Sequence, residues 1–198
     1  MNRFLQLLLL SIKASRGASC GLLDVGRLNL WVRPTDLDAL GHMNNGIYFS
    51  IMDLGRVDLM IRSGMADALK PHGVYPVAAQ ESMTFRKSLS PFQKYVLETR
   101  VAGFDERGAY MEQRFVVDGE IYAQAFVRAR FIRKSGGTVM MAELLDMLGV
   151  EPGTTIPVVP EWAVQWAEAT RLPSTRSEAP SVWEEIAPVV PASEEARA

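Results

Sequence analysis

The 198-residue sequence has the length of one domain with extensions. Its residues are 48% hydrophobic and 22% charged, as expected for a globular protein with a buried core. The formal net charge of −2 argues against a nucleic-acid-binding protein, which would normally carry a basic domain or stripe. The single cysteine excludes an intrachain disulfide. With only two histidines, His42 and His72, no metal site is expected, because zinc sites usually combine several His or Cys ligands.

Residues 1–20 form a separate apolar segment at the N-terminus. Its uninterrupted apolar core runs only from Leu7 to Leu10, whereas a helix that spans a membrane needs about 20 apolar residues. A signal peptide with Arg3 in its basic n-region is an alternative, but the apolar centre is short and no clear Ala-x-Ala cleavage site follows. The segment is predicted to be a short amphipathic helix that docks on the domain, on a partner subunit or on a membrane surface.

The first predicted strand covers residues 25–32, where apolar residues alternate imperfectly with other residues. Pro34 ends the strand, because proline cannot donate to a strand ladder. Residues 35–45 then form a polar loop that contains two carboxylates, a histidine and two asparagines. Because an apolar run follows directly, this loop is predicted to lead into the N-terminus of a buried helix, where free backbone amides and the positive end of the dipole lie.

The helix is predicted to start at Asn44 or Asn45, because asparagine is a favoured N-cap residue. It is predicted to stop at Gly64, and apolar residues at every third or fourth position give it a buried stripe. Gly55 inside the helix indicates close approach by another backbone segment, since glycine otherwise weakens a helix. A short second helical stretch is predicted over residues 65–70.

A series of strands is predicted after this point, because the apolar period changes to two. The strands cover residues 76–87, 95–104, 109–117 and 120–133. Asp118-Gly119 is a strong hairpin signal between the last two strands. Three or four strands joined by tight turns form an antiparallel meander. The order of one strand, a helix and then antiparallel strands predicts an α+β fold in which the sheet wraps around the helix.

Two further helices are predicted, over residues 140–148 and 161–169. Proline, serine, alanine and glutamate dominate from residue 171 onward, a composition typical of a mobile tail. The predicted domain organisation is an apolar N-terminal segment (1–20), a central domain (21–135), a helical extension (136–170) and a tail (171–198).

The polar loop also carries a family resemblance. Its motif is Asp36-x-Asp38-x-x-Gly41-His42-x-Asn44-Asn45-x-x-Tyr48. The motif resembles that of the 4-hydroxybenzoyl-CoA thioesterase branch of the hotdog-fold acyl-CoA thioesterases, and a weaker resemblance extends over residues 28–132. The resemblance implies a homodimer or homotetramer with active sites at subunit boundaries. It implies hydrolysis of an acyl-CoA thioester to free acid and coenzyme A without a metal or other cofactor, since the thioester is already activated.

The same resemblance assigns roles within the loop. Asp38, the second aspartate of the pair, would be the catalytic residue, as nucleophile or as general base for water. Backbone amides around Asn44 to Gly46 would form the oxyanion hole, in agreement with the general chemistry of a carboxylate beside a helix N-terminus. His42 could orient Asp38 or the substrate carbonyl, or could equally be a buried histidine with a backbone partner. Asp36 is expected to be structural.

Four more residues are candidates for the site. Asn45 is expected to cap the helix together with its neighbour, and one of the two side chains could hydrogen-bond the thioester or the catalytic water. Tyr48 is expected in the core or in a pocket wall. Arg86 and Lys87 lie near a predicted bend, where they could meet the phosphates of coenzyme A or could simply keep a strand edge soluble.

Other residues bear on the substrate. Some hotdog enzymes place their acidic residue inside the helix, where this chain has Asp53, but Asp53 is expected instead to form an intrahelical ion pair with Arg56, at a spacing of three. Pocket depth is expected to depend on helix and strand residues such as Ile51, Leu54, Met83 and Phe85.

Two other functions remain open at this level. A non-catalytic protein that binds acyl-CoA or lipid at a membrane surface would explain the apolar N-terminal segment with its basic flanks. A dehydratase that acts on a hydroxyacyl thioester would use a histidine near a carboxylate, as His42 and Asp38 could be. The expected location is cytoplasmic, with or without peripheral contact to a membrane.

Overall fold

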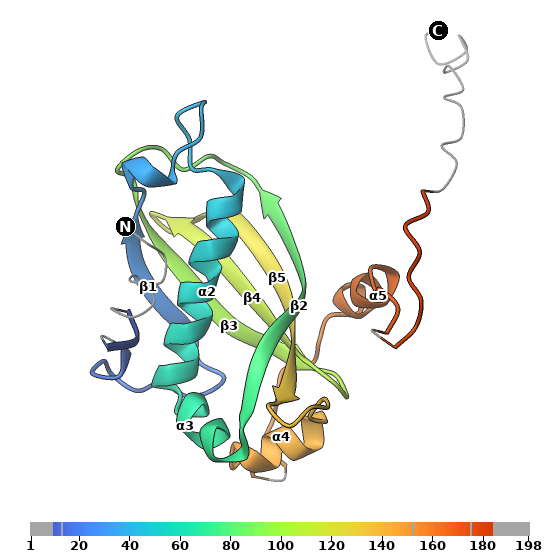
Figure 1. The fold of residues 1–198 in the computed structure, drawn as a ribbon. Coiled ribbons are helices and arrows are strands. Elements are labelled where there is room, and N and C mark those ends of the chain that lie inside the picture. The colour runs from blue at the N-terminus through green and yellow to red at the C-terminus, as the bar shows by residue number, and fades with distance from the viewer. Residues whose placement is uncertain (1–9, 13, 152, 175, 184–198) are drawn as a thin grey trace, which may run out of the picture.

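Five strands and one long helix make up the centre of the fold (Figure 1). The computed structural model describes residues 10–12, 14–151, 153–174 and 176–183. The strands are β1 (Gly26–Trp31), β2 (Val74–Phe85), β3 (Lys94–Phe104), β4 (Ala109–Val117) and β5 (Glu120–Arg133). The helices are α2 (Asn45–Arg62), α3 (Met65–Leu69), α4 (Met141–Met147) and α5 (Glu161–Ala169), and short 3-10 turns cover Pro34–Asp36 and Lys70–His72.

The sheet has the order β1-β3-β4-β5-β2, and every neighbouring pair is antiparallel. Strands β3 to β5 form the predicted meander, and Asp118 and Gly119 join the last two with positive φ angles of 49° and 81°, as an Asn-Gly-type or Asp-Gly-type hairpin requires. Strand β2 is not part of the meander, because it pairs with β5 at the edge opposite β1. Since α2 connects the two edge strands, it has to cross one face of the sheet.

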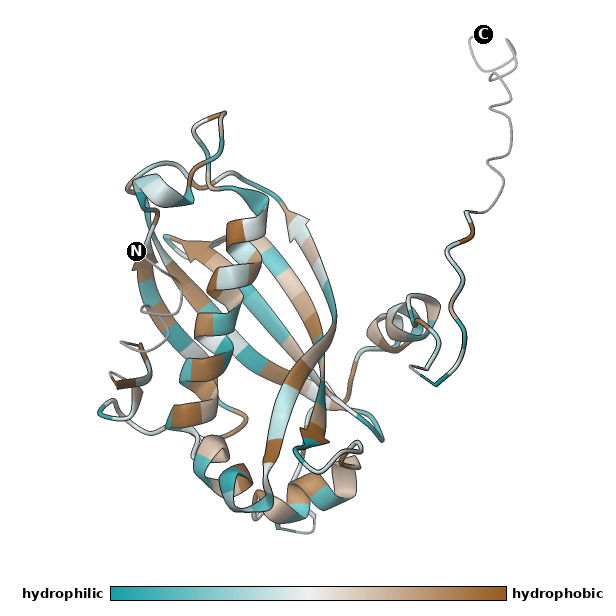
Figure 2. Cartoon of the chain, viewed as in Figure 1, coloured by the Kyte–Doolittle hydropathy of each residue, from teal (hydrophilic) through white to brown (hydrophobic). Residues whose placement is uncertain are grey.

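Helix α2 lies against that face, as the sequence predicts, and apolar residues recur on each of its turns (Figures 1 and 2). The residues buried on α2 follow a spacing of three and four: Tyr48, Ile51, Met52, Leu54, Gly55, Asp58 and Leu59. Asp58 is the polar member of this set, and its carboxylate accepts from Arg62 one turn later at 3.0 Å. The α+β prediction of a sheet wrapped around a central helix is confirmed.

Gly55 marks the closest approach between α2 and the sheet. A methyl group at this position would lie 2.4 Å from Thr99 Oγ1 and 2.9 Å from Gln113 Nε2. Gln113 is fully buried, and its amide donates to Thr99 Oγ1 at 2.9 Å and to the Met52 carbonyl at 3.0 Å. The predicted close approach at Gly55 is therefore present. However, the atoms that approach the helix belong to side chains of β3 and β4, whereas the sequence predicted a backbone segment.

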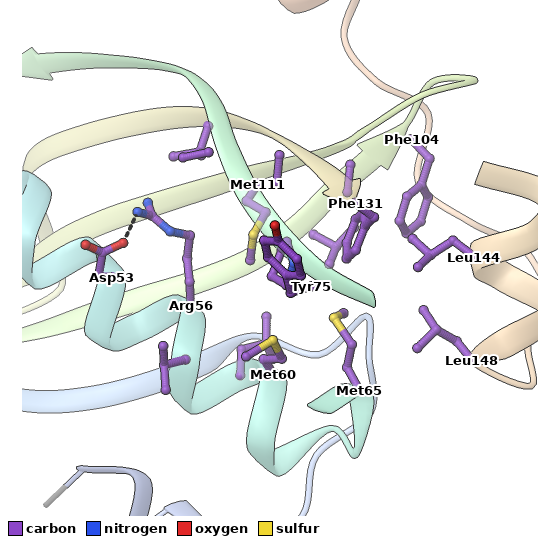
Figure 3. Close-up of a pocket in the computed structure, with 18 residues that line it drawn as sticks. Asp53, Arg56, Met60, Met65, Tyr75, Phe104, Met111, Phe131, Leu144 and Leu148 are labelled. Carbon is purple, nitrogen blue, oxygen red and sulfur yellow. Dashed lines mark hydrogen bonds and ion pairs between the residues drawn. The ribbon is translucent and has the colours of Figure 1, made fainter. Parts of the chain in front are cut away.

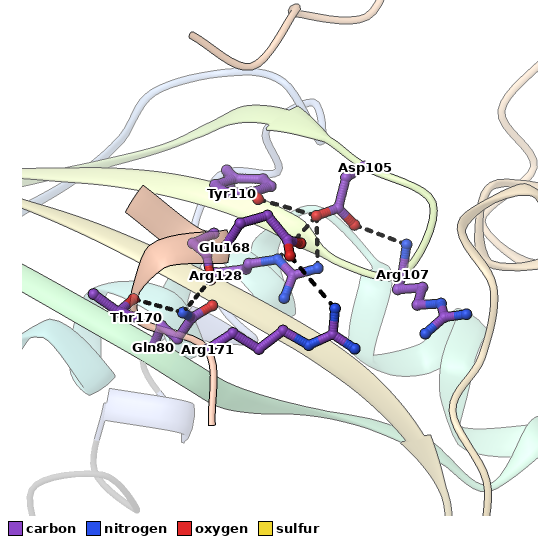
Figure 4. A network of polar contacts seen from close by, with 9 residues as sticks. Gln80, Asp105, Arg107, Tyr110, Arg128, Glu168, Thr170 and Arg171 are labelled. Atoms are coloured by element: carbon purple, nitrogen blue, oxygen red, sulfur yellow. Dashed lines mark hydrogen bonds and ion pairs between the residues drawn. The ribbon is translucent and has the colours of Figure 1, made fainter. Parts of the chain in front are cut away.

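The opposite face of the sheet is covered in part by α5. Residues of three strands and of the α5 region form a second apolar cluster: Ala102, Tyr110, Phe126, Val159, Ala163 and Ala167. Gln80 of β2 fastens the C-terminal end of α5, because its side-chain amide donates to the Ala167 carbonyl at 2.7 Å and to Thr170 Oγ1 at 2.8 Å (Figure 4). The predicted helical extension thus packs on the sheet.

A polar network borders this cluster (Figure 4). Asp105 accepts from the Tyr110 hydroxyl at 3.0 Å and from Arg128 Nε at 2.9 Å, and it pairs with Arg128 Nη2 at 2.7 Å. Burial and the neighbouring Asp105 carboxylate raise the pKa of Tyr110 to about 12. The tyrosine therefore stays protonated at neutral pH and acts as a donor that holds the β3–β4 turn.

Half of the predicted N-terminal segment, residues 1–9 and 13, and much of the predicted tail lie outside the described residues. In the part of the chain that the structure covers, no helix is long and apolar enough to cross a membrane. The same part contains no group of three or more His, Cys, Asp or Glu side chains able to hold a metal ion. The division of the chain at residues 20, 135 and 170 stays a prediction.

Glu112 is the centre of an ion network on the outer face of the sheet. It is 3% exposed, and its carboxylate accepts from Arg100 and Arg114 and from the Gln124 amide. Burial raises the pKa of Glu112, but the two guanidinium groups outweigh burial, so the pKa is lowered from its ordinary value of 4.5.

We expect Gly55→Ala to lower the free energy of unfolding by about 1–3 kcal/mol, because the added methyl group overpacks the contact with Thr99. The clash outweighs the gain of about 1 kcal/mol that alanine brings to a helix. Urea unfolding would measure the difference. A variant as stable as the original protein would show that α2 lies farther from the sheet.

We expect Glu112→Gln to lower the free energy of unfolding by about 2 kcal/mol at neutral pH. Because the folded pKa is lowered, the stabilisation by Glu112 is present above the ordinary carboxyl range and is lost as pH falls through it. The difference between the two proteins should therefore shrink below about pH 4.5. Unfolding curves at several pH values would test this, with Glu98→Gln at a more exposed ion pair as the control. A difference that does not vary with pH would contradict it.

Candidate functional site

The loop before α2 is held by hydrogen bonds to its neighbours. The Asn44 amide donates to the Asp36 carbonyl at 2.8 Å, and the Met43 amide donates to the Leu89 carbonyl at 3.0 Å. The Asp36 side chain is 3% exposed and accepts from the Arg33 amide at 3.0 Å, as its expected structural role requires. These bonds fix the ends of the loop and leave residues 38–42 at its tip.

Asp38 is half-buried at this tip. Its Oδ1 atom accepts from the Leu40 amide at 2.8 Å and from the His42 amide at 3.2 Å. Its own amide donates to the His42 carbonyl at 2.8 Å. Among the described residues no hydrogen-bond partner is present for Oδ2. One carboxylate oxygen is thus fixed by the loop, and the second is available to a water molecule or a substrate.

His42 contacts Asp38 through its backbone. Its side chain is exposed, so the alternative of a buried histidine with a satisfied partner does not describe this residue. Within the described structure the imidazole has no hydrogen bond to Asp38. The orientation of Asp38 therefore depends on the His42 amide, and the ring remains free to meet a ligand.

The first turn of α2 contains one unused amide. Asn44 is the N-cap, and its Oδ1 atom accepts from the Gly46 amide at 2.9 Å. The Ile47 amide donates to the Asn44 carbonyl at 2.9 Å. The Asn45 amide has no partner in the part of the chain that the structure describes. Of the amides from Asn44 to Gly46, that of Asn45 is therefore the one free to receive an oxyanion at the positive end of the helix.

Tyr48 lies in the core, with 2% of its surface exposed. Its ring makes edge contacts with Phe85 and Phe115, at centroid distances of 5.1 Å and 4.8 Å. Burial raises the pKa of Tyr48, partly offset by hydrogen bonding with the Leu89 backbone. These contacts make Tyr48 a support for the first turn of α2.

Arg86 and Lys87 lie just beyond β2, in the loop that also contains Leu89. Both are exposed, and both pair with Glu120, at 2.7 Å and 2.6 Å. Hydrogen bonds from Lys87 and Arg86 lower the pKa of Glu120. Because the Leu89 carbonyl binds the Met43 amide, the two cations lie at the same end of the fold as the Asp38 loop, but their charges are shared with a carboxylate.

A cavity of about 350 Å³ lies along the second half of α2, at a place where no pocket is predicted from the sequence (Figure 3). Helix α2 contributes a stripe of lining residues at Asp53, Arg56, Val57 and Met60, and the buried Leu59 beside it. The residues expected to set pocket depth, Ile51, Leu54, Met83 and Phe85, are not among its lining residues. The spacing of three and four along this second stripe is the sequence signal that could have indicated the cavity.

Comparison with known proteins relates these features to a family. The family described as the thioesterase-like superfamily matches residues 32–173. Protein THEM6 from Xenopus laevis is 32% identical over 99 residues, which cover 50% of this chain and 48% of that protein. A probable thioesterase from Saccharomyces cerevisiae is 25% identical over 142 residues, or 71% of this chain and 62% of that protein. The chain thus spans about half the length of the THEM6 protein that it matches.

A solved structure agrees in fold. The probable thioesterase YbaW from Escherichia coli superposes with a TM-score of 0.59 at 18% sequence identity, over 62% of this chain and 95% of that one. Because the family match covers the central helix, strands β2 to β5 and both C-terminal helices, this chain belongs to the thioesterase-like superfamily and has its hotdog fold.

Proposed function

We propose that this protein hydrolyses an acyl-CoA thioester to the free acid and coenzyme A. The observation that carries the proposal is that, among the described residues, one oxygen of Asp38 and the amide of Asn45, the first of α2, both have no hydrogen-bond partner. A positioned carboxylate serves as a base or nucleophile, and a helix N-terminal amide stabilises an oxyanion. Membership of the thioesterase-like superfamily supports thioester hydrolysis in general.

Two routes fit these groups. As a general base, Asp38 takes a proton from water, the resulting hydroxide adds to the thioester carbonyl, and the carbon–sulfur bond then breaks as the thiolate receives the proton. As a nucleophile, Asp38 adds to the carbonyl directly and expels the thiolate, and water then cleaves the mixed anhydride. In both routes the Asn45 amide would stabilise the negative charge on the carbonyl oxygen.

The finer assignments belong to the same proposal. The motif supports the 4-hydroxybenzoyl-CoA thioesterase-like branch, and Arg86 and Lys87 would meet the phosphates of coenzyme A in exchange for Glu120. A homodimer or homotetramer, a cytoplasmic location and peripheral membrane contact through the N-terminal segment remain predictions. Acyl-CoA binding without turnover, the alternative function, would leave the same fold and would show no thiol release.

We expect Asp38→Asn to reduce thiol release from an acyl-CoA panel at least about 100-fold, because the amide can neither accept the proton nor attack the carbonyl. Asp67→Asn is the matched control, since Asp67 is an exposed aspartate of α3 outside the loop. The panel should contain short aliphatic, long aliphatic and aromatic acyl groups. Equal rates for Asp38→Asn and the original protein would remove Asp38 from the mechanism.

We expect Asn45→Pro to lower kcat about 100-fold or more, because proline removes the amide that would bind the oxyanion. Proline is well tolerated at the first position of a helix, and the extended backbone of Asn44 (φ −61°, ψ 135°) suits a residue before proline. Asn45→Ala, which keeps the amide and removes the side chain, should stay close to the original rate. If Asn45→Ala is as slow as Asn45→Pro, the side chain, not the amide, is what the reaction requires.

A further inference from the structure

The cavity along α2 has an open rim and a closed floor. Exposed residues of α2 and β2 form the rim, among them Asp53, Tyr75 and Ala78. Buried residues of the sheet and of α4 form the floor, among them Val127 and Leu144. Its volume of about 350 Å³ is within the range of small-molecule sites, at the lower end. The cavity is therefore suited to a small ligand that enters between the helix and the edge strand.

The wall of the cavity is apolar and adaptable. Three methionines line it, Met60 and Met65 from the helical side and Met111 from β4 (Figure 3). Methionine side chains are unbranched and adjust to irregular ligands. Phe104 and Phe131 line the cavity near α4. Such a wall matches a flexible hydrocarbon chain better than a rigid, polar aromatic acid, which would leave its polar substituents unpaired.

Charge is confined to one end of the cavity. Arg56 and Asp53 are the charged residues among the 18 that line it, and they form an ion pair with each other (Figure 3). The Arg56 side chain is 15% exposed and also binds Glu81 Oε1 at 2.9 Å and Gln113 Oε1 at 3.0 Å. The guanidinium group is thus held in place by three partners, at the edge of an otherwise apolar volume. The charged end of the cavity is the one toward the start of α2, and the remainder is apolar, as binding of a hydrocarbon chain requires.

We infer that this cavity binds the aliphatic chain of a fatty acyl group. The inference deepens the proposed function, on which it rests, because it names an aliphatic acyl group as the substrate class. Asp53 follows Asn45 by eight residues, or about 12 Å along the helix. An acyl group whose carbonyl lies at the start of α2 reaches the cavity only when its chain is long enough to cover this distance. Short acyl groups would gain nothing from it.

Binding of saturated fatty acids to the Asp38→Asn protein, measured by calorimetry, tests the cavity without requiring turnover. Affinity should rise about fourfold for each added methylene until the cavity is filled, and benzoate should bind weakly. Ala78→Phe narrows the mouth from an exposed position and should weaken binding of the longest acids about tenfold. Ala79→Phe, next to it on β2 and not among the lining residues, is the matched control and should leave the affinity unchanged.

A second pair of variants changes the floor. Phe131→Ala should shift the preferred acid to a longer chain, because it enlarges the cavity, whereas Phe126→Ala on the opposite face of β5 should not shift it. An affinity that does not depend on chain length would overturn the inference. The inference would also fail if Ala78→Phe and Ala79→Phe changed the affinity equally and Phe131→Ala and Phe126→Ala changed the preferred chain length equally. Chain-dependent binding without thiol release would support the cavity and would refute only the proposed hydrolysis. Asp38-dependent hydrolysis with chain-independent binding would refute only the cavity.

Discussion

The fold depends on the close contact between α2 and the sheet at Gly55. Only a residue without a side chain lets the helix come near enough for Gln113 to bind the Met52 carbonyl and Thr99 together. These two hydrogen bonds satisfy the fully buried side-chain amide of Gln113, which would otherwise destabilise the core. The contact sets the distance between the middle of α2 and the sheet.

The candidate site follows from that placement. The loop before α2 is closed by the hydrogen bond from the Asn44 amide to the Asp36 carbonyl and is held to Leu89 through the Met43 amide, so the Asp38 carboxylate and the Asn45 amide belong to one hydrogen-bonded segment. Farther along the same helix, Asp53, Arg56, Val57, Leu59 and Met60 line the cavity, together with residues of strand β2. One helix thus presents two chemically different surfaces, a polar start and an apolar flank. An acyl thioester likewise has a polar part, the carbonyl group, and an apolar part, the acyl chain.

Much of this could be predicted from the sequence, because local signals were strong. The Asn44 cap, the Asp118-Gly119 hairpin and the apolar stripe of α2 each follow from short-range chemistry. The position of β2 at the far edge could not be predicted, since strand order depends on long-range pairing that a periodic pattern does not encode. The cavity was missed for a related reason. Its lining comes from four strands and several helices, and only the stripe on α2 is visible in one stretch of sequence.

Helix α5 belongs to the same packed unit as the sheet, although it lies far along the chain. Every strand is complete by Arg133, yet Tyr110 and Phe126 are shielded from water by a helix that begins at Glu161. A protein truncated after Arg133 would expose these two aromatic rings as part of an apolar surface, and exposed apolar surfaces promote aggregation. The C-terminal helix therefore covers an apolar part of the sheet that would otherwise face water.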